Sequence, residues 1–471
     1  MPLTRGNGAR GGRTRAAVTA ALLAAGLLAV PGQAGAEPEQ PCGIGRTLRY
    51  IVVFDQGTRA EEAQRRIDAA CGETVTYYAQ IGVAVAGSRD RSFTTRLGDV
   101  RAFSTQQELG GQGAAAKRKN RSRLTAAIKA SPSVATTDRS GEQWDMAMIK
   151  ADEAHAYSMG SRSVVVGVLD SGIDAGHPDL AAAVDPAVSA GCVSGAPDTR
   201  REAWQPSAFE HGTHVAGTIA AANDGKGTTG VAPGVRLASV KVVDDDGYVS
   251  PEAAVCGFMW AATKGMRLVN SSFTAGPWTL TCKDKGSEQW VVHEAMRRAV
   301  SYATNRGVLT IAAMGNEGTN LASTKCDALP GELRGVIGVS SIGAERVKAS
   351  YSSYGLGTTD LTAPGGDHRQ KPDSSNQGCV LSTVPAGYGY YCGTSMATPH
   401  VVGVAALLAS RFPSAGPTAL TRMLYNQAET LPCPSDYDLN GDGAQDAACS
   451  GYADYNGFYG HGLVNALNAV R

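Results

Sequence analysis

The sequence predicts an α/β fold in which a doubly wound, mainly parallel sheet carries helices on both faces, preceded by a small α+β unit. Two patterns predict the larger unit. From Ser163 onward, short continuous apolar runs alternate with stretches of helical periodicity. Runs such as Val164–Leu169 are typical of strands buried on both faces, and helices between such strands are typical of parallel crossovers. We therefore expect a doubly wound sheet.

The bulk composition indicates a globular protein and excludes some partners. A chain of 471 residues is long enough for one large domain plus further segments, because single cores stop growing near roughly 250 to 300 residues. With 43% hydrophobic and 18% charged residues, general disorder is excluded. The formal net charge of +0 gives no electrostatic reason to expect nucleic acid or an anionic membrane as a partner. Since no docking module is evident, we expect a monomer.

The N-terminus predicts the compartment. Several arginines precede an apolar run, Ala16–Val30, which is followed by the small residues Ala34-Gly35-Ala36. This is the pattern of a secretory signal peptide. The run is shorter than the roughly 20 residues of a spanning helix, which argues against a membrane anchor. We expect residues 1–36 to be a signal peptide and the protein to be secreted.

The small α+β unit follows the signal. Its pattern predicts a strand, a charged amphipathic helix and a further strand with apolar alternation, at Arg49–Asp55, Arg59–Ala70 and Thr74–Ala86. A glycine-rich, basic stretch at Gly110–Arg123 interrupts the unit, and we interpret its Lys117-Arg118-Lys119 run as a solvated loop. A helix at Leu124–Ala130 and a short strand at Ser133–Thr137 are expected next.

The larger unit supplies the remaining strands and helices. Further buried strands are expected at Leu237–Val243, Leu268–Phe273, Val308–Ala313 and Val336–Ser340. Helices are expected at Pro251–Lys264, Glu288–Asn305 and Ser395–Arg411.

The ten cysteines support the predicted compartment. An even number of cysteines in an exported chain favours disulfides over reduced thiols. The number of possible pairings among them is large. Closeness in sequence favours Cys379 with Cys392 and Cys433 with Cys449.

The first candidate for chemistry is Asp170. In open α/β sheets, functional residues gather at the carboxyl ends of the strands. The first buried strand ends in Leu169-Asp170-Ser171-Gly172, which places Asp170 at that edge. Taken alone this is weak, because an Asp at a strand end is more often a helix cap or turn former.

The second candidate lies in His211-Gly212-Thr213-His214-Val215-Ala216-Gly217. Its small residues let a helix begin tightly against the sheet with an imidazole at its start. A zinc site would need a following Glu and a third ligand, which this spacing lacks. We assign the general base to His211 and expect His214 to be a packed structural histidine.

The third candidate is Ser395, within Gly393-Thr394-Ser395-Met396-Ala397-Thr398-Pro399-His400. A Ser at a helix start is usually only a cap. Here Pro399 suits the first turn, and the glycine permits close approach of the chain, so the hydroxyl can project into a cleft beside the helix dipole. Amide hydrolysis requires such a Ser with a base held in its tautomer by a buried carboxylate.

Taken in this order, the three motifs resemble the subtilisin-type serine proteases. The resemblance covers roughly Gln143 to the C-terminus and includes Gly230-Val231-Ala232-Pro233, Ala363-Pro364-Gly365 and Gly462-Leu463-Val464-Asn465. It implies a serine endopeptidase that acts on polypeptides, with Asp170, His211 and Ser395 as its triad and no cofactor for catalysis. It also implies that Asn316, in Ala312–Gly318, donates to the oxyanion together with the Ser395 backbone N–H.

The same resemblance implies how the chain is processed and what it prefers. Residues 37–139 would be a propeptide that acts as chaperone and transient inhibitor, with self-cleavage near Asp138-Arg139-Ser140, and residues 140–471 the catalytic domain. The primary pocket would be walled by Ser271–Gly276 and Ala312–Gly315, which are mostly small or apolar. A hydrophobic residue before the scissile bond is therefore favoured, although Glu317 leaves a basic one open.

A separate pattern near the C-terminus predicts calcium. Oxygen-bearing side chains stand at alternate positions, with glycine at the turn, at Asp438, Asn440, Asp442 and Asp446. Because Cys449 stands where a calcium loop has its bidentate Glu, a structural calcium ion and a plain Asp/Gly-rich turn both remain open. Asp179 and Asp224 suggest a second calcium site more weakly.

Three other functions compete with this interpretation. A protease-like binding protein with a relic triad is disfavoured because the triad residues and Asn316 are all present. A secreted α/β-hydrolase esterase would place a Gly-x-Ser-x-Gly elbow before its Asp and His, and the order here is different. Residues 49–139 could also act as a protease inhibitor after cleavage, which is compatible with the main interpretation.

Overall fold

The computed structural model describes residues 42–98, 101–110, 137–370 and 378–471. The predicted signal peptide, almost all of the stretch at 110–123, the helix at 124–130 and all but the last residue of the strand at 133–137 lie outside these residues.

The N-terminal part forms a four-stranded sheet in the order β2-β3-β1-β4. Its elements are β1 (Leu48–Val53), α1 (Ala60–Ala69), β2 (Gly72–Tyr78), β3 (Val83–Ser88), α2 (Phe93–Leu97) and β4 (Ala102–Phe103). The single strand expected at Thr74–Ala86 is wrong, because this segment is an antiparallel hairpin. Its apolar alternation continues through the turn, where Gly82 adopts φ 62°.

The larger part contains a seven-stranded sheet in the order β11-β10-β9-β8-β5-β7-β6, and all of its pairings are parallel. Its strands are β5 (Val165–Asp170), β6 (Ala190–Gly191), β7 (Arg236–Lys241), β8 (Leu268–Ser271), β9 (Leu309–Ala313), β10 (Val336–Ile342) and β11 (Leu361–Pro364). A separate hairpin joins β12 (Val380–Val384) to β13 (Gly387–Tyr391).

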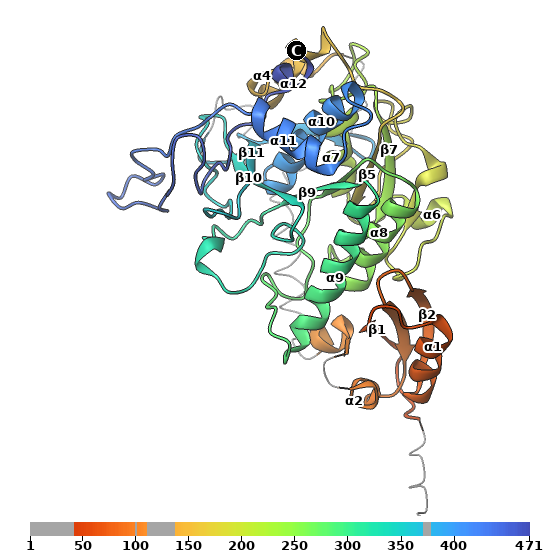
Figure 1. Ribbon diagram of the computed structural model, residues 1–471. Helices are drawn as coiled ribbons and strands as arrows, with labels where there is room; N and C mark the ends of the chain where they lie inside the picture. Colours follow the sequence, from red (N-terminus) through yellow and green to blue (C-terminus); the bar gives the residue numbers. More distant parts are fainter. Residues whose placement is uncertain (1–41, 99–100, 111–136, 371–377) are drawn as a thin grey trace, which may run out of the picture. The chain divides into compact units, whose positions relative to one another are not determined.

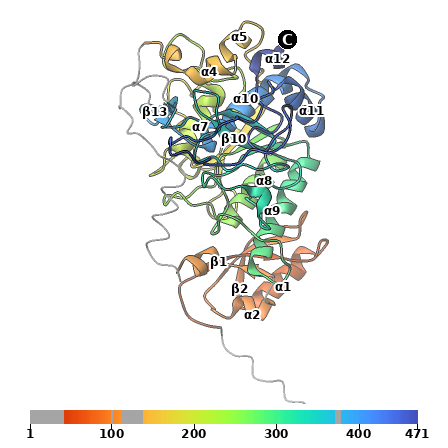
Figure 2. The same ribbon diagram turned by 90° about the vertical axis from the view of Figure 1, so that its left-hand side faces the viewer.

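Helices cover both faces of this sheet, which confirms the doubly wound α/β fold (Figure 1). One apolar core contains α7 (His211–Ala220) and α10 (Thr394–Arg411), and the other contains α8 (Pro251–Thr263) and α9 (Glu288–Asn305). The remaining helices are short or lie near the C-terminus: α4 (Trp144–Met148), α5 (Ala151–His155), α6 (Arg201–Trp204), α11 (Pro417–Gln427) and α12 (Ala466–Val470). Figure 2 shows α8 and α9 side by side, with α7 and α10 in the other layer.

The N-terminal sheet shares a core with the larger part. Ile51, Val53 and Phe103 are buried in the same apolar cluster as α8 and α9. On α9, Arg298 donates to the carbonyl oxygens of Phe54 and Ile81. The α8–α9 layer therefore has the N-terminal sheet on one side and the parallel sheet on the other.

All ten cysteines are paired, and the two predicted disulfides are confirmed. The bonds are Cys42–Cys71, Cys192–Cys256, Cys282–Cys326, Cys379–Cys392 and Cys433–Cys449. Among the described residues, no helix has the length and apolar character needed to cross a membrane.

Candidate active site

Four of the predicted residues lie at the carboxyl edge of the parallel sheet. Asp170 is the last residue of β5, and Asn316 follows the end of β9. His211 is the first residue of α7 on the same side, and Ser395 lies in the first turn of α10. Strand ends and helix starts meet at this edge in a doubly wound sheet, so residues distant in sequence come together.

Asp170 and His211 form a buried pair. The Nδ1 atom of His211 lies 2.8 Å from Oδ1 and 2.9 Å from Oδ2 of Asp170. Both side chains are at most 1% exposed. Because the carboxylate can only accept, Nδ1 carries the proton, and the Nε2 atom is left as the basic nitrogen. Among the described residues Nε2 has no hydrogen-bond partner, so it can take a proton from a nucleophile.

Ser395 is held by its neighbour Ser272. Its hydroxyl donates to the Ser272 carbonyl oxygen over 3.0 Å, and the Ser272 hydroxyl donates to the Ser395 carbonyl oxygen over 2.8 Å. No hydrogen bond joins Ser395 to His211 in this state. Rotation about the Ser395 side-chain bond is needed before Oγ faces Nε2, as is common in enzymes without substrate.

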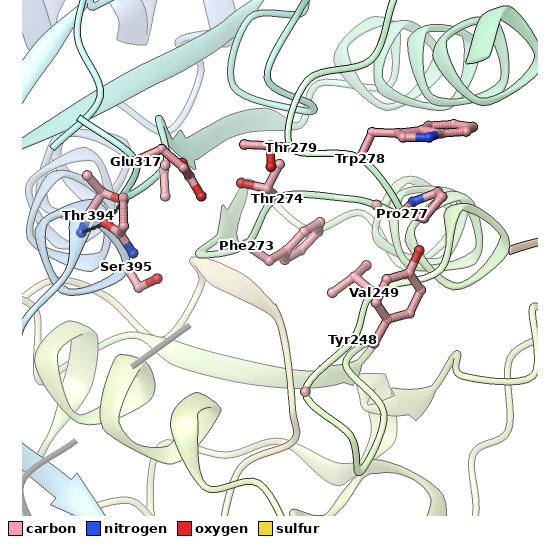
Figure 3. Close-up of a pocket in the computed structure, with 15 residues that line it drawn as sticks. Tyr248, Val249, Phe273, Thr274, Pro277, Trp278, Thr279, Glu317, Thr394 and Ser395 are labelled. Atoms are coloured by element: carbon pink, nitrogen blue, oxygen red, sulfur yellow. Dashed lines mark hydrogen bonds between the residues drawn. The ribbon is translucent and has the colours of Figure 1, made fainter. Parts of the chain in front are cut away.

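Asn316 is oriented by Thr394. The Oδ1 atom of Asn316 accepts from both the backbone N–H and the hydroxyl of Thr394, each over 2.9 Å. These two donors fix which end of the amide is the oxygen and turn the Nδ2 donor away from Thr394. Figure 3 shows Thr394 and Ser395 together at the end of the pocket. The amide therefore presents a donor at the nucleophile turn.

A pocket beside Ser395 has aromatic and small walls (Figure 3). Both predicted walls contribute to it, through Phe273 and Gly315 among others. Sequence reasoning missed the opposite wall, because it comes from loops that only the fold brings over the strand ends. The full lining is Gly247, Tyr248, Val249, Phe273, Thr274, Gly276, Pro277, Trp278, Thr279, Ala313, Gly315, Asn316, Glu317, Thr394 and Ser395.

The acidic Glu317 and the bulky Met314 lie at or beside the predicted walls but are placed differently. A Cβ atom on Gly315 would lie 2.7 Å from Oε2 of Glu317. The carboxylate is therefore close to this glycine, and both residues line the pocket. By contrast, Met314 points into the protein and is 1% exposed in a small core with Leu321. Glu317 can therefore affect a bound side chain directly, whereas Met314 does not line the pocket.

His214 is a packed structural histidine, as expected. It is fully buried, and its Nε2 atom lies 3.1 Å from the carbonyl oxygens of Val380 and Gly389. Its ring stacks on Tyr391 with 4.4 Å between centroids. Burial, assisted by the neighbouring His211, lowers the pKa of His214 to about 3. It is therefore neutral near pH 7, and it anchors α7 to the β12–β13 hairpin.

The predicted calcium residues lie in one exposed loop. Asp438 accepts from the backbone N–H groups of Gly441, Asp442 and Gly443 over 2.7–3.2 Å, and these bonds lower its pKa. The loop also brings Asn440 and Asp446 to the same turn, and the Cys433–Cys449 disulfide closes it. The oxygens of Asp438, Asn440 and Asp446 accept hydrogen bonds from N–H groups of this same loop, so a structural calcium ion stays a prediction beside a plain Asp/Gly-rich turn.

The two residues of the weaker calcium suggestion also accept hydrogen bonds from protein donors. The two oxygens of Asp179 already accept from the hydroxyl of Tyr388 and the backbone N–H of Thr228, over 3.0–3.1 Å. Asp224 accepts from the N–H of Lys226 in its own turn. Protein donors thus surround the Asp179 carboxylate, where a cation would need acceptors only.

Comparison with known proteins identifies relatives of this chain. The sequence model of the subtilase family matches residues 161–462 of this chain. Subtilisin DY from Bacillus licheniformis is 33% identical over 325 residues, which cover 69% of this chain and 97% of that protein. Subtilisin NAT from Bacillus subtilis subsp. natto is 36% identical over 272 residues, which cover 58% of this chain and 62% of the relative's length. A solved structure of a protease from Pseudoalteromonas arctica has 27% identity and a TM-score of 0.55, and covers 72% of this chain and 99% of its own.

Proposed function

This chain belongs to the subtilase family of serine proteases, and from that premise we propose that it is a secreted endopeptidase with Asp170, His211 and Ser395 as its triad. The observation that carries the proposal is the buried contact of His211 Nδ1 with both oxygens of Asp170, which leaves Nε2 as a base at the strand ends. Ser395 lies in the first turn of its helix, α10, at the same edge.

The proposed reaction follows from these atoms. Ser395 Oγ attacks the substrate carbonyl carbon and gives its proton to His211 Nε2, while Asp170 stabilises the imidazolium. The oxygen becomes negative and accepts hydrogen bonds from Asn316 and from the Ser395 backbone N–H. His211 then protonates the leaving amine, and a water molecule hydrolyses the acyl-enzyme by the reverse sequence of proton transfers.

The pocket supports large apolar side chains as the preferred residues of polypeptide substrates. Its walls carry Tyr248, Phe273 and Trp278, and burying an aromatic or aliphatic side chain there is worth roughly 1.5–3 kcal/mol. Glu317 is the acidic side chain of the lining. We therefore propose that the enzyme prefers an apolar residue before the scissile bond. A basic residue is the second preference, because it can pair with Glu317.

The N-terminal part supports the role of residues 37–139 as propeptide. It has an apolar core of its own, and it also buries Ile51, Val53 and Phe103 against α8 and α9. Phe103 packs on Trp278 with 4.9 Å between ring centroids, which connects it to a wall of the pocket. Such a unit can assist folding of the α8–α9 layer and can obstruct the pocket until it is removed.

The proposed boundary near Asp138-Arg139-Ser140 lies outside the pocket in this state. Asp138 forms a parallel bridge with Gly227, and Arg139 donates from its backbone N–H to Gly227 over 2.7 Å and pairs with Glu142. Cleavage at this boundary by the same molecule therefore requires the segment to leave this place and reach Ser395.

One experiment tests triad, processing and secretion together. The full chain and its Ser395→Ala variant are secreted from the same host, and chain length and casein hydrolysis are followed. We expect the wild type to shorten to about residues 140–471 and to digest casein, and the variant to do neither. A variant that still processes itself or digests casein would exclude Ser395 as the nucleophile.

A further inference from the structure

A second, fully buried histidine–carboxylate pair lies behind the nucleophile. His400 belongs to α10, and its Nε2 atom lies 2.9 Å from Oδ2 of Asp145 on α4. Its Nδ1 atom lies 2.8 Å from the carbonyl oxygen of Met396, the residue that follows Ser395. Both side chains of the pair are 0% exposed.

The hydrogen-bond pattern determines where the protons are. The Met396 carbonyl can only accept, so Nδ1 of His400 carries a proton. A second proton lies between Nε2 and Oδ2 of Asp145, whichever of the two atoms holds it. The link is thus a directed hydrogen bond between two helices, made by two fully buried side chains.

Stability alone does not explain this pair. The Oδ1 atom of Asp145 is buried and has no hydrogen-bond partner among the described residues. A buried pair with an unsatisfied oxygen is often no more stable than apolar side chains of the same size. Its location, between the start of the catalytic unit and the nucleophile helix, points to a role in geometry.

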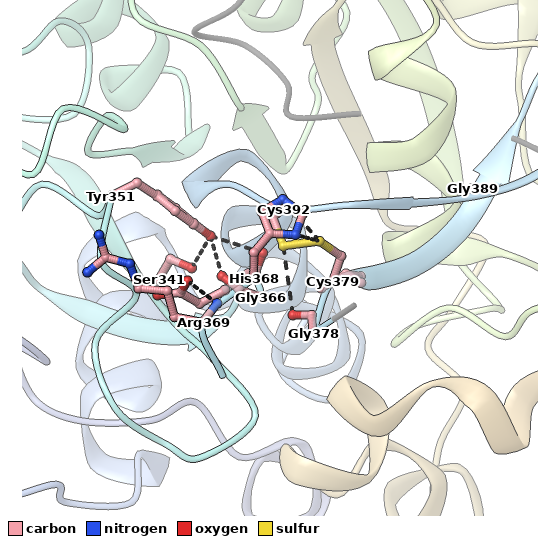
Figure 4. The surroundings of a disulfide bond; sticks show 12 residues. Ser341, Tyr351, Gly366, His368, Arg369, Gly378, Cys379, Gly389 and Cys392 are labelled. Atoms are coloured by element: carbon pink, nitrogen blue, oxygen red, sulfur yellow. Dashed lines mark hydrogen bonds between the residues drawn. A yellow bond between two sulfur atoms is a disulfide. The ribbon is translucent and has the colours of Figure 1, made fainter. Parts of the chain in front are cut away.

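The residues beside Asp145 bind the other flank of the nucleophile. Trp144 donates from Nε1 to the carbonyl oxygen of Cys379 over 3.0 Å, and Cys379 is bonded to Cys392, which shortly precedes Ser395. Figure 4 shows this disulfide and His368, whose Nδ1 lies 3.6 Å from Cys379 Sγ. Because both sulfurs are bonded to each other, this group is not a metal site.

We propose that Asp145 and His400 are positioning residues for Ser395. Together with Trp144, they clamp the nucleophile turn from both sides, through the disulfide before it and the helix after it. The inference rests on the proposed function, in which Ser395 is the nucleophile. A shift of about 1 Å in a reacting atom can cost about 100-fold in rate, so a clamp of this kind acts on turnover and not on substrate binding.

The test compares three variants of the processed enzyme. Asp145→Leu keeps the side-chain size but removes the link. Asp145→Asn keeps it, because the amide can donate to Nε2 of a neutral His400. Met146→Ala weakens the same helix at a neighbouring buried residue but leaves the link intact. We measure kcat and KM on a peptide amide, count active sites by titration with diisopropyl fluorophosphate, and record the melting temperature.

The proposal expects a fall in kcat of about tenfold for Asp145→Leu with KM unchanged, and a kcat near that of the wild type for Asp145→Asn and Met146→Ala. It is overturned if Asp145→Leu has the wild-type kcat, or if Met146→Ala loses as much. Should Asp145→Leu not accumulate, His400→Leu removes the same link from α10, with the same expected and overturning results. An inactive wild type would refute the proposed function and this inference with it; an active wild type and an equally active Asp145→Leu overturn this inference alone.

Discussion

At the scale of single residues, hydrogen bonds decide which atom of each side chain can react. Asp170 fixes the tautomer of His211, and Thr394 fixes the orientation of the Asn316 amide. Neither His211 nor Asn316 could do its proposed work in the other orientation, since a protonated Nε2 is not a base and an amide oxygen repels an oxyanion.

Removing the Asn316 side chain tests the oxyanion role. Asn316→Ala should lower kcat by roughly 100 to 1,000-fold with KM little changed, the loss measured for the corresponding residue of subtilisin, because the donor acts mainly in the transition state. Steady-state kinetics on a peptide amide measures this. Asn320→Ala, on the same loop but outside the pocket lining, is the matched control. Equal kcat values for wild type and Asn316→Ala would exclude the role.

The sequence predicted the site only in part. Asp170, His211 and Ser395 stand in motifs whose small residues and helix starts are visible without a structure, and their roles remain predictions. Tyr248 and Trp278 could not be found, because each lies in a loop whose path over the strand ends depends on the whole sheet. That His211 and Ser395 are not hydrogen-bonded in this state depends on a side-chain rotation, which no sequence pattern reports.

A buried carboxyl predicts how stability changes with pH. Burial raises the pKa of Glu332 to about 7, although its Oε2 accepts from the Ala328 N–H over 2.6 Å. An unfolded glutamate ionises near 4.3. Since the folded pKa is the higher one, the stability contributed by Glu332 is present below the unfolded value and is lost as pH rises to about 7.

Glu332→Gln should therefore remove this loss. In a Ser395→Ala background, which prevents self-digestion, the melting temperature of Glu332→Gln should exceed that of its parent at pH 8. The two proteins should converge near pH 4, where Glu332 is protonated in both states. A constant difference between them from pH 4 to 8 would mean that Glu332 does not titrate in this range.

At the scale of elements, long periodic segments were predicted well and short ones were not. The helix α9 begins and ends at the predicted residues, because its eighteen residues carry a clear helical pattern. The two-residue strand β6 has no pattern long enough to recognise. The β12–β13 hairpin was missed as well. Its carbonyl oxygens at Val380 and Gly389 contact His214 on α7, a helix that is distant in sequence.

If the loop from Asp438 to Asp446 binds calcium, the ion should stabilise the folded protein. Calcium at about 100 times its dissociation constant should stabilise the protein by about 2.7 kcal/mol, which raises the melting temperature. EGTA should reverse the shift, and Asp442→Ala should abolish it. Asp224→Ala, at the weaker candidate site, should keep it. The loop is a plain turn if calcium leaves the melting temperature unchanged, and the site lies elsewhere if Asp442→Ala responds normally.

At the scale of the whole molecule, the described residues contain two sheets of different topology, and the boundary between propeptide and catalytic domain stays a prediction. What composition could not predict is how closely they join. Residues of β1 and β4 share one apolar core with α8 and α9, so these helices are buried from two sides. An interface of this kind also buries polar groups, and those groups make binding depend on pH.

Glu252 is the clearest of these groups. It is 2% exposed, its Oε1 lies 3.9 Å from Nη1 of Arg49 on β1, and a cavity between the units is lined by Arg49, Asp244 and Glu252. Burial raises the pKa of Glu252, while Arg49 partly opposes the shift and Asp244 adds to it. Removal of the N-terminal unit would open this cavity to water, where the pKa returns toward the ordinary value.

The bound state therefore takes up protons, and inhibition by the separate propeptide should tighten as the pH falls toward the ordinary pKa of glutamate. The inhibition constant of residues 37–139 against the processed enzyme, measured on a peptide amide at several pH values, tests this. Glu252→Gln provides the control, because it buries no charge at any pH and should flatten the dependence. If wild type and Glu252→Gln respond to pH equally, other groups govern the interface, and Arg49 compensates the buried carboxylate in full.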